Sequence, residues 1–241
     1  TNGAWQFSID RVRLDLGLET LQVINDFDAV ARSVPYCKAE DLMQIGGGKP
    51  SRGSKAVLGP GTGLGMAGLV PCGEGFHAFT TEGGHARFAP SDAREEFLLR
   101  LLKQKLSYVS QEDVLSGRGL EAIYVGLAAY QSQQTGASRA AEISASALAG
   151  SDELCIASLD VFCAILGAVA GDFALQTGAR GGVYLGGGIL PRMRDFLLHS
   201  RFRESFEAKG RFRSYMEAIP SFLLLHPQPG LLGAASVFQE R

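Results

Sequence analysis

Hydrophobic and polar positions along the chain predict a mixed α/β protein. Over residues 92–106 the apolar residues recur at the spacing of one helix face, which is typical of an amphipathic helix. Residues 55–81 instead predict three antiparallel strands, broken at two glycine-rich turns. The same patterning predicts further helices over residues 8–17, 27–33, 111–115, 120–131, 141–149 and 151–176, after Pro191 and after Pro229. It predicts short strands at 21–24, 183–186 and 221–225, and a loop over 36–53.

The longest apolar run extends from Cys155 to Leu175 and contains Asp160 and Asp172. Two carboxylates within the run favour a buried helix of a globular protein over a membrane span. The 241 residues are 46% hydrophobic, enough for a sizeable core, and their net charge is −2 with mixed signs. We therefore expect neither a nucleic-acid partner nor a membrane partner.

The four cysteines are scattered and form no Cys-x-x-Cys pair. This spacing argues against a zinc site and favours a reduced, cytoplasmic setting. Cys155 and Cys163 lie in the apolar helical run, where we expect them to be small core residues.

The most informative segment, residues 56–65, places four glycines and Thr62 directly after an apolar run. Glycines allow close approach of a backbone to a ligand, and converging N–H groups bind anions. The alternative is a tight hairpin without a ligand. The segment is not a dinucleotide fingerprint, because the sixth position counted from Gly59 is Leu64, and no Walker A pattern is present. A glycine loop between two strands suits the phosphate-binding hairpins of sugar kinases and actin-type ATPases.

Three polar positions carry candidate chemistry. Asn25 and Asp26 stand at the predicted end of a strand and start of a helix, where a carboxylate can accept a substrate proton; the alternative is a helix N-cap. Glu82 and His85 flank two glycines and could hold adjacent hydroxyls of a polyol, or form a polar turn. Glu112 is a weaker candidate, because the default interpretation of an isolated glutamate near a helix start is a capping role.

A second glycine cluster, Gly186–Gly188, follows the predicted strand at 183–186. A turn without side chains offers a flat surface for a purine, and the alternative is a tight strand-to-helix crossover. Two glycine turns that each follow an apolar strand favour a nucleotide site more than either turn does alone.

These segments occur in an order that closely resembles the bacterial-type ATP-dependent glucokinases. The shared motifs are Ile24-Asn-Asp-Phe27, Gly59-Pro-Gly-Thr-Gly-Leu-Gly65, Thr81-Glu-Gly-Gly-His85, Val114-Leu-Ser-Gly-Arg-Gly-Leu120, Gly186-Gly-Gly-Ile-Leu-Pro-Arg192 and Pro229-Gly-Leu-Leu-Gly233. The resemblance implies transfer of the γ-phosphate of ATP to the 6-hydroxyl of D-glucose, with Mg²⁺ as cofactor. It also implies a cytoplasmic homodimer.

The resemblance further implies a role for each candidate residue. Asp26 is the catalytic base, and the glucose-binding set is Asn25, Asp26, Glu82, His85 and Glu112. The nucleotide is bound by Gly59, Gly61, Thr62 and Gly63 at its phosphates and by Gly186, Gly187 and Gly188 at its adenosine. No side chain of the chain is expected to be a metal ligand.

The fold implied is the actin-like ATPase fold, a two-domain α/β sugar kinase fold with ribonuclease H-like cores. Residues 1–36 and 226–241 would be the remainder of an incomplete small domain, and residues 37–225 the large domain. The family's first phosphate loop, Asp-x-Gly-Gly-Thr, does not occur in the sequence, so we expect an N-terminally shortened form. The related ROK kinases carry a cysteine-rich zinc motif after the equivalent of His85. The cysteine-free segment here indicates the non-ROK branch.

Two other functions fit the same residues. A sugar-binding or regulatory protein would keep Asn25, Glu82 and His85 without transferring phosphate, and the absent first loop favours it. A kinase for another hexose would use the same residue types, because residue type alone does not distinguish epimers at one hydroxyl.

Overall fold

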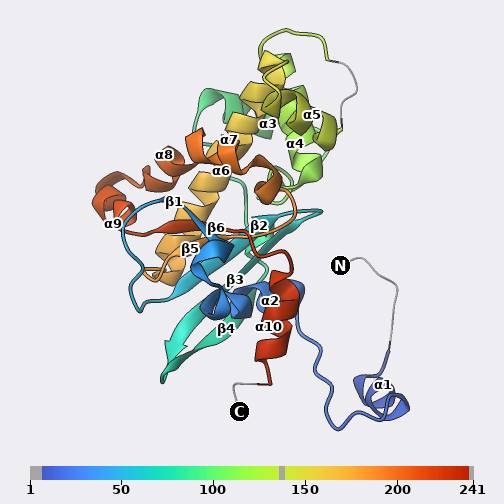
Figure 1. Cartoon of the computed structure of the whole chain (residues 1–241). Coiled ribbons are helices and arrows are strands. Elements are labelled where there is room, and N and C mark those ends of the chain that lie inside the picture. The colour runs from blue at the N-terminus through green and yellow to red at the C-terminus, as the bar shows by residue number, and fades with distance from the viewer. Residues whose placement is uncertain (1–6, 136–138, 239–241) are drawn as a thin grey trace.

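The structure is a computed structural model that describes residues 7–135 and 139–238 (Figure 1). Its centre is a six-stranded sheet in the order β1-β6-β5-β2-β3-β4. Strand β2 pairs in parallel with β5, and β5 with β6, whereas β2, β3 and β4 form two successive antiparallel hairpins. The strands are β1 (Leu42–Gly46), β2 (Lys55–Pro60), β3 (Leu64–Cys72), β4 (Gly75–Thr81), β5 (Val183–Leu185) and β6 (Ser221–Leu224).

Helices cover both faces of this sheet (Figure 1). The α-helices are α1 (Ile9–Asp15), α2 (Asp26–Ser33), α3 (Ala93–Leu102), α4 (Gly117–Tyr130), α5 (Ala140–Leu148), α6 (Glu153–Thr177), α7 (Arg194–His199), α8 (Phe202–Glu207), α9 (Arg213–Glu217) and α10 (Pro229–Ser236). Short 3-10 helices are η1 (Val34–Tyr36), η2 (Ala39–Asp41), η3 (Gly83–His85), η4 (Leu190–Met193) and η5 (Gly210–Phe212).

The alternation of side chains along β2 sends its apolar residues into two different cores. Ala56 and Leu58 join the larger core, which α6 fills together with α3, α4, α5 and α8. Val57 points to the opposite face and joins a smaller core beneath α2. A strand buried on both faces carries a continuous apolar run, and this explains why residues 56–58 lack a polar position.

Helix α6 runs through the middle of the larger core. The two aspartates of the helix are both paired: Arg201 Nε donates to Asp160 Oδ2 at 2.6 Å and Lys209 Nζ donates to Asp172 Oδ1 at 2.6 Å. The helix is long and apolar enough to cross a membrane, but 72% of its most apolar window is buried within the structure. The interpretation of this run as a buried core helix is therefore confirmed. Cys155 and Cys163 are buried on it, and burial raises the pKa of the Cys163 thiol to about 12.

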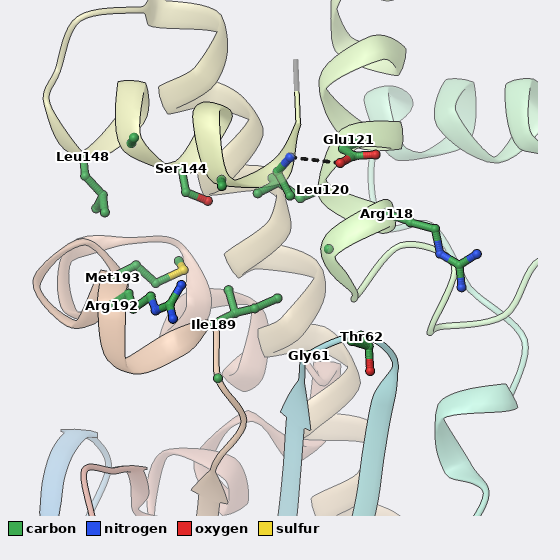
Figure 2. Close-up of a pocket in the computed structure, with 15 residues that line it drawn as sticks. Gly61, Thr62, Arg118, Leu120, Glu121, Ser144, Leu148, Ile189, Arg192 and Met193 are labelled. Carbon is green, nitrogen blue, oxygen red and sulfur yellow. Dashed lines mark hydrogen bonds between the residues drawn. The ribbon is translucent and has the colours of Figure 1, made fainter. Parts of the chain in front are cut away.

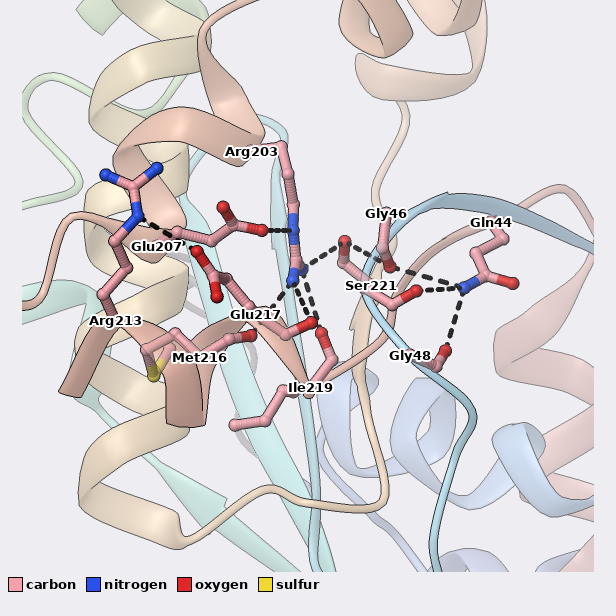
Figure 3. Close-up of polar contacts among 11 residues, drawn as sticks. Gln44, Gly46, Gly48, Arg203, Glu207, Arg213, Met216, Glu217, Ile219 and Ser221 are labelled. Atoms are coloured by element: carbon pink, nitrogen blue, oxygen red, sulfur yellow. Dashed lines mark hydrogen bonds and ion pairs between the residues drawn. The ribbon is translucent and has the colours of Figure 1, made fainter.

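A partly buried arginine joins the start of α8 to the sheet (Figure 3). Arg203 Nε contacts Glu207 Oε1 at 2.5 Å, and Nη1 donates to the backbone oxygen of Ile219 at 2.9 Å and to Ser221 Oγ at 3.2 Å. Its Nη2 donates to the backbone oxygens of Met216 and Glu217, at the end of α9. All three guanidinium nitrogens are thus engaged, so this side chain has a structural role.

The predicted strands at 183–186, 221–225 and within 55–81 are confirmed, as are the helices at 27–33, 92–106, 141–149 and 151–176 to within a few residues. Three expectations are wrong. Residues 21–24 are not a strand, because no described segment pairs with them and Val23 is exposed. Residues 111–115 form a turn, and α4 begins only after Ser116, whose Oγ accepts the Gly119 N–H.

The third error lies in 36–53, where the loop-like sequence contains strand β1. This strand is at the edge of the sheet and pairs only with β6, so just one of its residues, Ile45, is buried. A half-exposed edge strand has a weak hydrophobic pattern, which explains why the sequence did not reveal it.

Helices α2 and α10 pack closely because a glycine stands at their contact. A Cβ at Gly233 would overlap the backbone oxygen of Ala29 on α2. We expect Gly233→Ala to lower the free energy of unfolding by roughly 1–3 kcal/mol, measured by urea denaturation. The matched control is Gly230→Ala on the same helix, where a Cβ meets nothing within 4 Å and the change should stay below about 1 kcal/mol. Equal effects of the two substitutions would contradict the close contact.

Candidate functional site

The first glycine turn joins β2 to β3 and contacts the start of α4. Within the turn, the Gly61 N–H donates to the Gly63 oxygen at 2.8 Å, and Thr62 is exposed at its tip. The Gly61 oxygen accepts the Gly117 N–H at 3.0 Å, which fixes the turn against the first residue of α4. The segment therefore forms a tight hairpin turn, and this turn also lies at the N-terminal end of a helix, where anions are favoured.

The second glycine turn lies directly beside the first. The Gly186 N–H donates to the Leu58 oxygen at 2.9 Å, and a Cβ at Gly59 would overlap the Gly186 oxygen. Gly187 has a φ of +87°, a conformation that favours glycine, and a Cβ there would overlap the Pro60 oxygen. The two turns meet because β2 and β5 are parallel neighbours, so their carboxyl ends lie at the same edge of the sheet.

A cavity of about 770 Å³ opens between these turns, α4 and α5 (Figure 2). Its wall is mainly apolar, with a few polar side chains, which is typical of a small-molecule site. Gly188 faces it, and a Cβ at Gly188 would meet nothing within 4 Å. The lining residues are Gly61, Thr62, Gly117, Arg118, Leu120, Glu121, Ala140, Ala141, Ser144, Ala145, Leu148, Gly188, Ile189, Arg192 and Met193.

The sequence did not reveal the contribution of α5 to this cavity. Ala141, Ala145 and Leu148 face it from one side of the helix, a spacing that also suits a helix packed against a core. Glu121 on α4 sets the position of α5, since its Oε1 accepts the Ala140 N–H at 3.0 Å. A tertiary contact of this kind has no local pattern in the sequence.

Asn25 and Asp26 begin helix α2. Asn25 is the N-cap: its Oδ1 accepts the N–H groups of Phe27 at 2.8 Å and Asp28 at 3.3 Å. Asp26 is exposed, and its Oδ1 accepts the same Phe27 N–H at 2.9 Å. The capping interpretation thus holds for Asn25, while the Asp26 carboxylate faces solvent. The Phe27 ring lies against Gly65, where a Cβ would overlap it, so this helix end lies beside the start of β3.

Glu82 and His85 lie on the short η3 segment after β4, and both are exposed. Glu82 Oε2 is 3.9 Å from His85 Nε2. Between them, Gly84 is buried so closely that a Cβ would overlap the Leu64 oxygen at the start of β3. The two side chains therefore extend from a backbone that is packed against the strand following the first glycine turn.

Glu112 connects these segments. Its Oε2 accepts the Leu64 N–H at 2.8 Å, and its own N–H donates to the Gly84 oxygen at 2.9 Å. A Cβ at Gly63 would overlap the same carboxylate oxygen, so the glycine turn needs a residue without a side chain there. The expected capping role near a helix start is wrong, since Glu112 lies in a turn. The start of β3 thus contacts the glycine turn, η3, Glu112 and the N-terminal end of α2.

Solved structures show which class of protein has this fold and edge. A glucokinase from an Antarctic psychrotroph superposes with a TM-score of 0.91 at 38% identity, covering 98% of this chain and 74% of that one. A ROK family glucokinase from Streptomyces griseus in complex with glucose and AMPPNP superposes with a TM-score of 0.62 at 22% identity, over 97% and 72% of the two chains. The molecule therefore has the actin-like ATPase fold of the sugar kinases, as the sequence predicts.

Sequence comparison identifies the family. The glucokinase family model matches residues 1–241. A glucokinase from Neisseria meningitidis is 48% identical over 237 residues, which are 98% of this chain and 72% of the relative. The chain belongs to the glucokinase family.

The hydrogen bond between Glu112 and Leu64 should stabilise the whole site edge. Glu112→Ala leaves the buried Leu64 N–H without an acceptor, so we expect the free energy of unfolding to fall by about 1–3 kcal/mol. Glu112→Gln keeps an oxygen of similar reach and should lose less than half as much. Urea denaturation monitored by circular dichroism measures both. If neither Glu112→Ala nor Glu112→Gln lowers the free energy of unfolding, the carboxylate does not stabilise the start of β3.

Proposed function

We propose that the protein transfers the γ-phosphate of ATP to the 6-hydroxyl of D-glucose at the carboxyl edge of its sheet. One observation carries the proposal: the start of β3 directly joins the glycine turn at 61–63 to the segments bearing Asn25, Asp26, Glu82, His85 and Glu112. A phosphate held by the turn would therefore lie close to a sugar held by these side chains. Membership of the glucokinase family supports this assignment.

The nucleotide part of the proposal rests on the cavity beside the two glycine turns. Its apolar wall from α5, Ile189 and Met193 suits a purine, and the Gly186–Gly188 turn allows close approach of the adenosine. Thr62 offers a hydroxyl, and Thr62 and Gly63 offer backbone N–H groups, for phosphate oxygens. Gly61 shapes the turn through its own N–H bond to the Gly63 oxygen, and Gly59 allows the two turns to touch. The Streptomyces griseus glucokinase with the same fold was solved in complex with AMPPNP, a non-hydrolysable ATP analogue, and this fits the assignment.

The sugar part rests on exposed polar side chains of complementary chemistry. Glu82 and His85 are 3.9 Å apart, a spacing at which both can reach neighbouring hydroxyls of one pyranose. Asn25 Oδ1 is engaged in the helix cap, so its amide NH₂ is the group left to donate to a hydroxyl. Glu112 uses Oε2 for Leu64, which leaves Oε1 as an acceptor for a sugar hydroxyl.

In the proposed reaction Asp26 accepts the proton of the glucose 6-hydroxyl as the oxygen attacks the γ-phosphate. Its carboxylate is exposed and held by a single backbone N–H, so one oxygen stays available. The described residues contain no cluster of three or more metal-ligating side chains, and Mg²⁺ requires none, since it binds phosphates, water and one or two carboxylates. Mg²⁺ bound with ATP would neutralise phosphate charge.

We also propose the branch of the family to which the chain belongs and its division into domains. The segment after His85 has no cysteine, which supports membership of the non-ROK branch. All six strands fall within residues 37–225, and α2 packs on α10, which supports residues 1–36 and 226–241 as one domain and 37–225 as another. A homodimer in the cytoplasm remains our expectation from the family resemblance.

Removal of the base should block the chemical step and leave the sugar bound. We expect Asp26→Asn to lower kcat by about 10²–10⁴-fold, because asparagine cannot accept the proton, with little change in the dissociation constant for glucose. A coupled assay for glucose 6-phosphate gives kcat, and calorimetric titration gives the dissociation constant. Asp28→Asn on the same helix is the control. Near-normal turnover of the Asp26 variant would remove this residue from the base role.

The side chains on η3 should act on sugar binding alone. We expect Glu82→Ala and His85→Ala each to raise the KM for glucose by about 10-fold or more, because each loses a hydrogen bond to a hydroxyl. The KM for ATP should change by less than about threefold. Steady-state kinetics with each substrate varied in turn measures both constants. An equal rise in both KM values would show that the two residues only support the backbone.

A further inference from the structure

Arg118 directly follows Gly117, the residue whose N–H binds the glycine turn at 61–63. It is the second residue of α4 and is exposed, and it lines the same cavity as Gly61 and Thr62. The hydrogen bond from the Gly117 N–H to the Gly61 oxygen sets the start of α4 directly against the turn. Any anion held by the turn therefore lies within the neighbourhood of this guanidinium.

The donors of Arg118 have no partner among residues 7–135 and 139–238. Its guanidinium makes no hydrogen bond or ion pair with them, in contrast to Arg203, whose three nitrogens are all engaged (Figure 3). Its backbone N–H is open too, whereas the Gly117 N–H binds the Gly61 oxygen and the Gly119 N–H binds Ser116 Oγ. One residue thus presents a charged fork and a backbone donor at a helix N-terminus.

The two arginines of the lining, Arg118 and Arg192, lie on opposite sides of the cavity, and Arg118 is on the side of Thr62. Figure 2 shows Arg118 and Thr62 together on one side, and Leu148 and Met193 on the other. A ligand with an apolar ring and an anionic tail would place its ring against Leu148 and Met193. Its tail would then extend toward Thr62 and Arg118. Glu121, the anionic residue in the lining, already accepts the Ala140 N–H.

We propose that Arg118 binds the terminal phosphates of the nucleotide through its guanidinium and its backbone N–H. This inference rests on the proposed function and adds a residue to it. A guanidinium matches two phosphate oxygens at once, and its fixed charge stabilises the charge that shifts onto the leaving phosphate during transfer. Arg118 would therefore favour nucleotides with two or three phosphates over shorter ones.

The test is calorimetric titration of the protein and its Arg118→Gln variant with adenosine, AMP, ADP and AMPPNP. We expect the substitution to lower the affinity for ADP and AMPPNP by about 10- to 100-fold. The affinity for adenosine and AMP should change by less than about twofold. Arg118→Lys keeps the charge and loses the fork, so its losses should be intermediate. Arg192→Gln is the control, because Arg192 lines the same cavity; the ratio of AMPPNP to adenosine affinity should be unchanged.

The outcomes separate the inference from the proposed function. The phosphate role of Arg118 is overturned if the Arg118→Gln variant binds ADP and AMPPNP as tightly as the parent protein. It is also overturned if the variant loses as much affinity for adenosine as for ADP and AMPPNP. In both cases the nucleotide site stands. If the parent protein binds none of the four compounds, the nucleotide site itself is wrong, and with it the proposed function. Thermal unfolding of each variant shows whether the fold is intact, as expected for an exposed side chain without partners.

Discussion

The hydrogen bond from the Leu64 N–H to Glu112 Oε2 fixes the edge of the sheet on which the site depends. It ties the first residue of β3 to a segment that lies far away in the sequence, and the Glu112 N–H extends the connection to Gly84. The segments meet so closely that a Cβ at Gly63, Gly65 or Gly84 would overlap the Glu112 carboxylate, the Phe27 ring or the Leu64 oxygen, respectively. The glycines therefore serve two purposes, since they bring these segments together and leave the turn at 61–63 open.

The parallel pairing of β2 and β5 brings together the two glycine turns proposed to bind the nucleotide. Because both strands run in the same direction, both are followed by their glycine turns at one edge, and Gly59 and Gly187 let the turns touch. Helix α5 then closes the cavity from above through its contact with Glu121. Sugar and nucleotide residues come from separate parts of the chain, and the sheet alone brings them to a common edge.

The sequence revealed the parts of this arrangement that have local signals. Glycine turns after apolar strands, the Asn25 cap and the long apolar run of α6 each have a pattern of their own, and all are present in the structure. Strand β1 and the non-helical turn at 111–115 escaped prediction, because an edge strand is half exposed and a turn fixed by Glu112 depends on a distant partner. The cavity wall from α5 and the open donors of Arg118 also arise only from tertiary contacts.

The pairing of α6 has a consequence for motion. The helix is buried along most of its length, and its two aspartates are held by Arg201 and Lys209 from the α8 side, while α5 also packs against it. We therefore expect its amides to exchange with solvent only when the whole core opens, and the exposed side chains of Glu82 and His85 to move more freely. The nucleotide wall from α5 is thus anchored to a buried helix, whereas two of the side chains proposed for the sugar, Glu82 and His85, extend into solvent and have room to reorient.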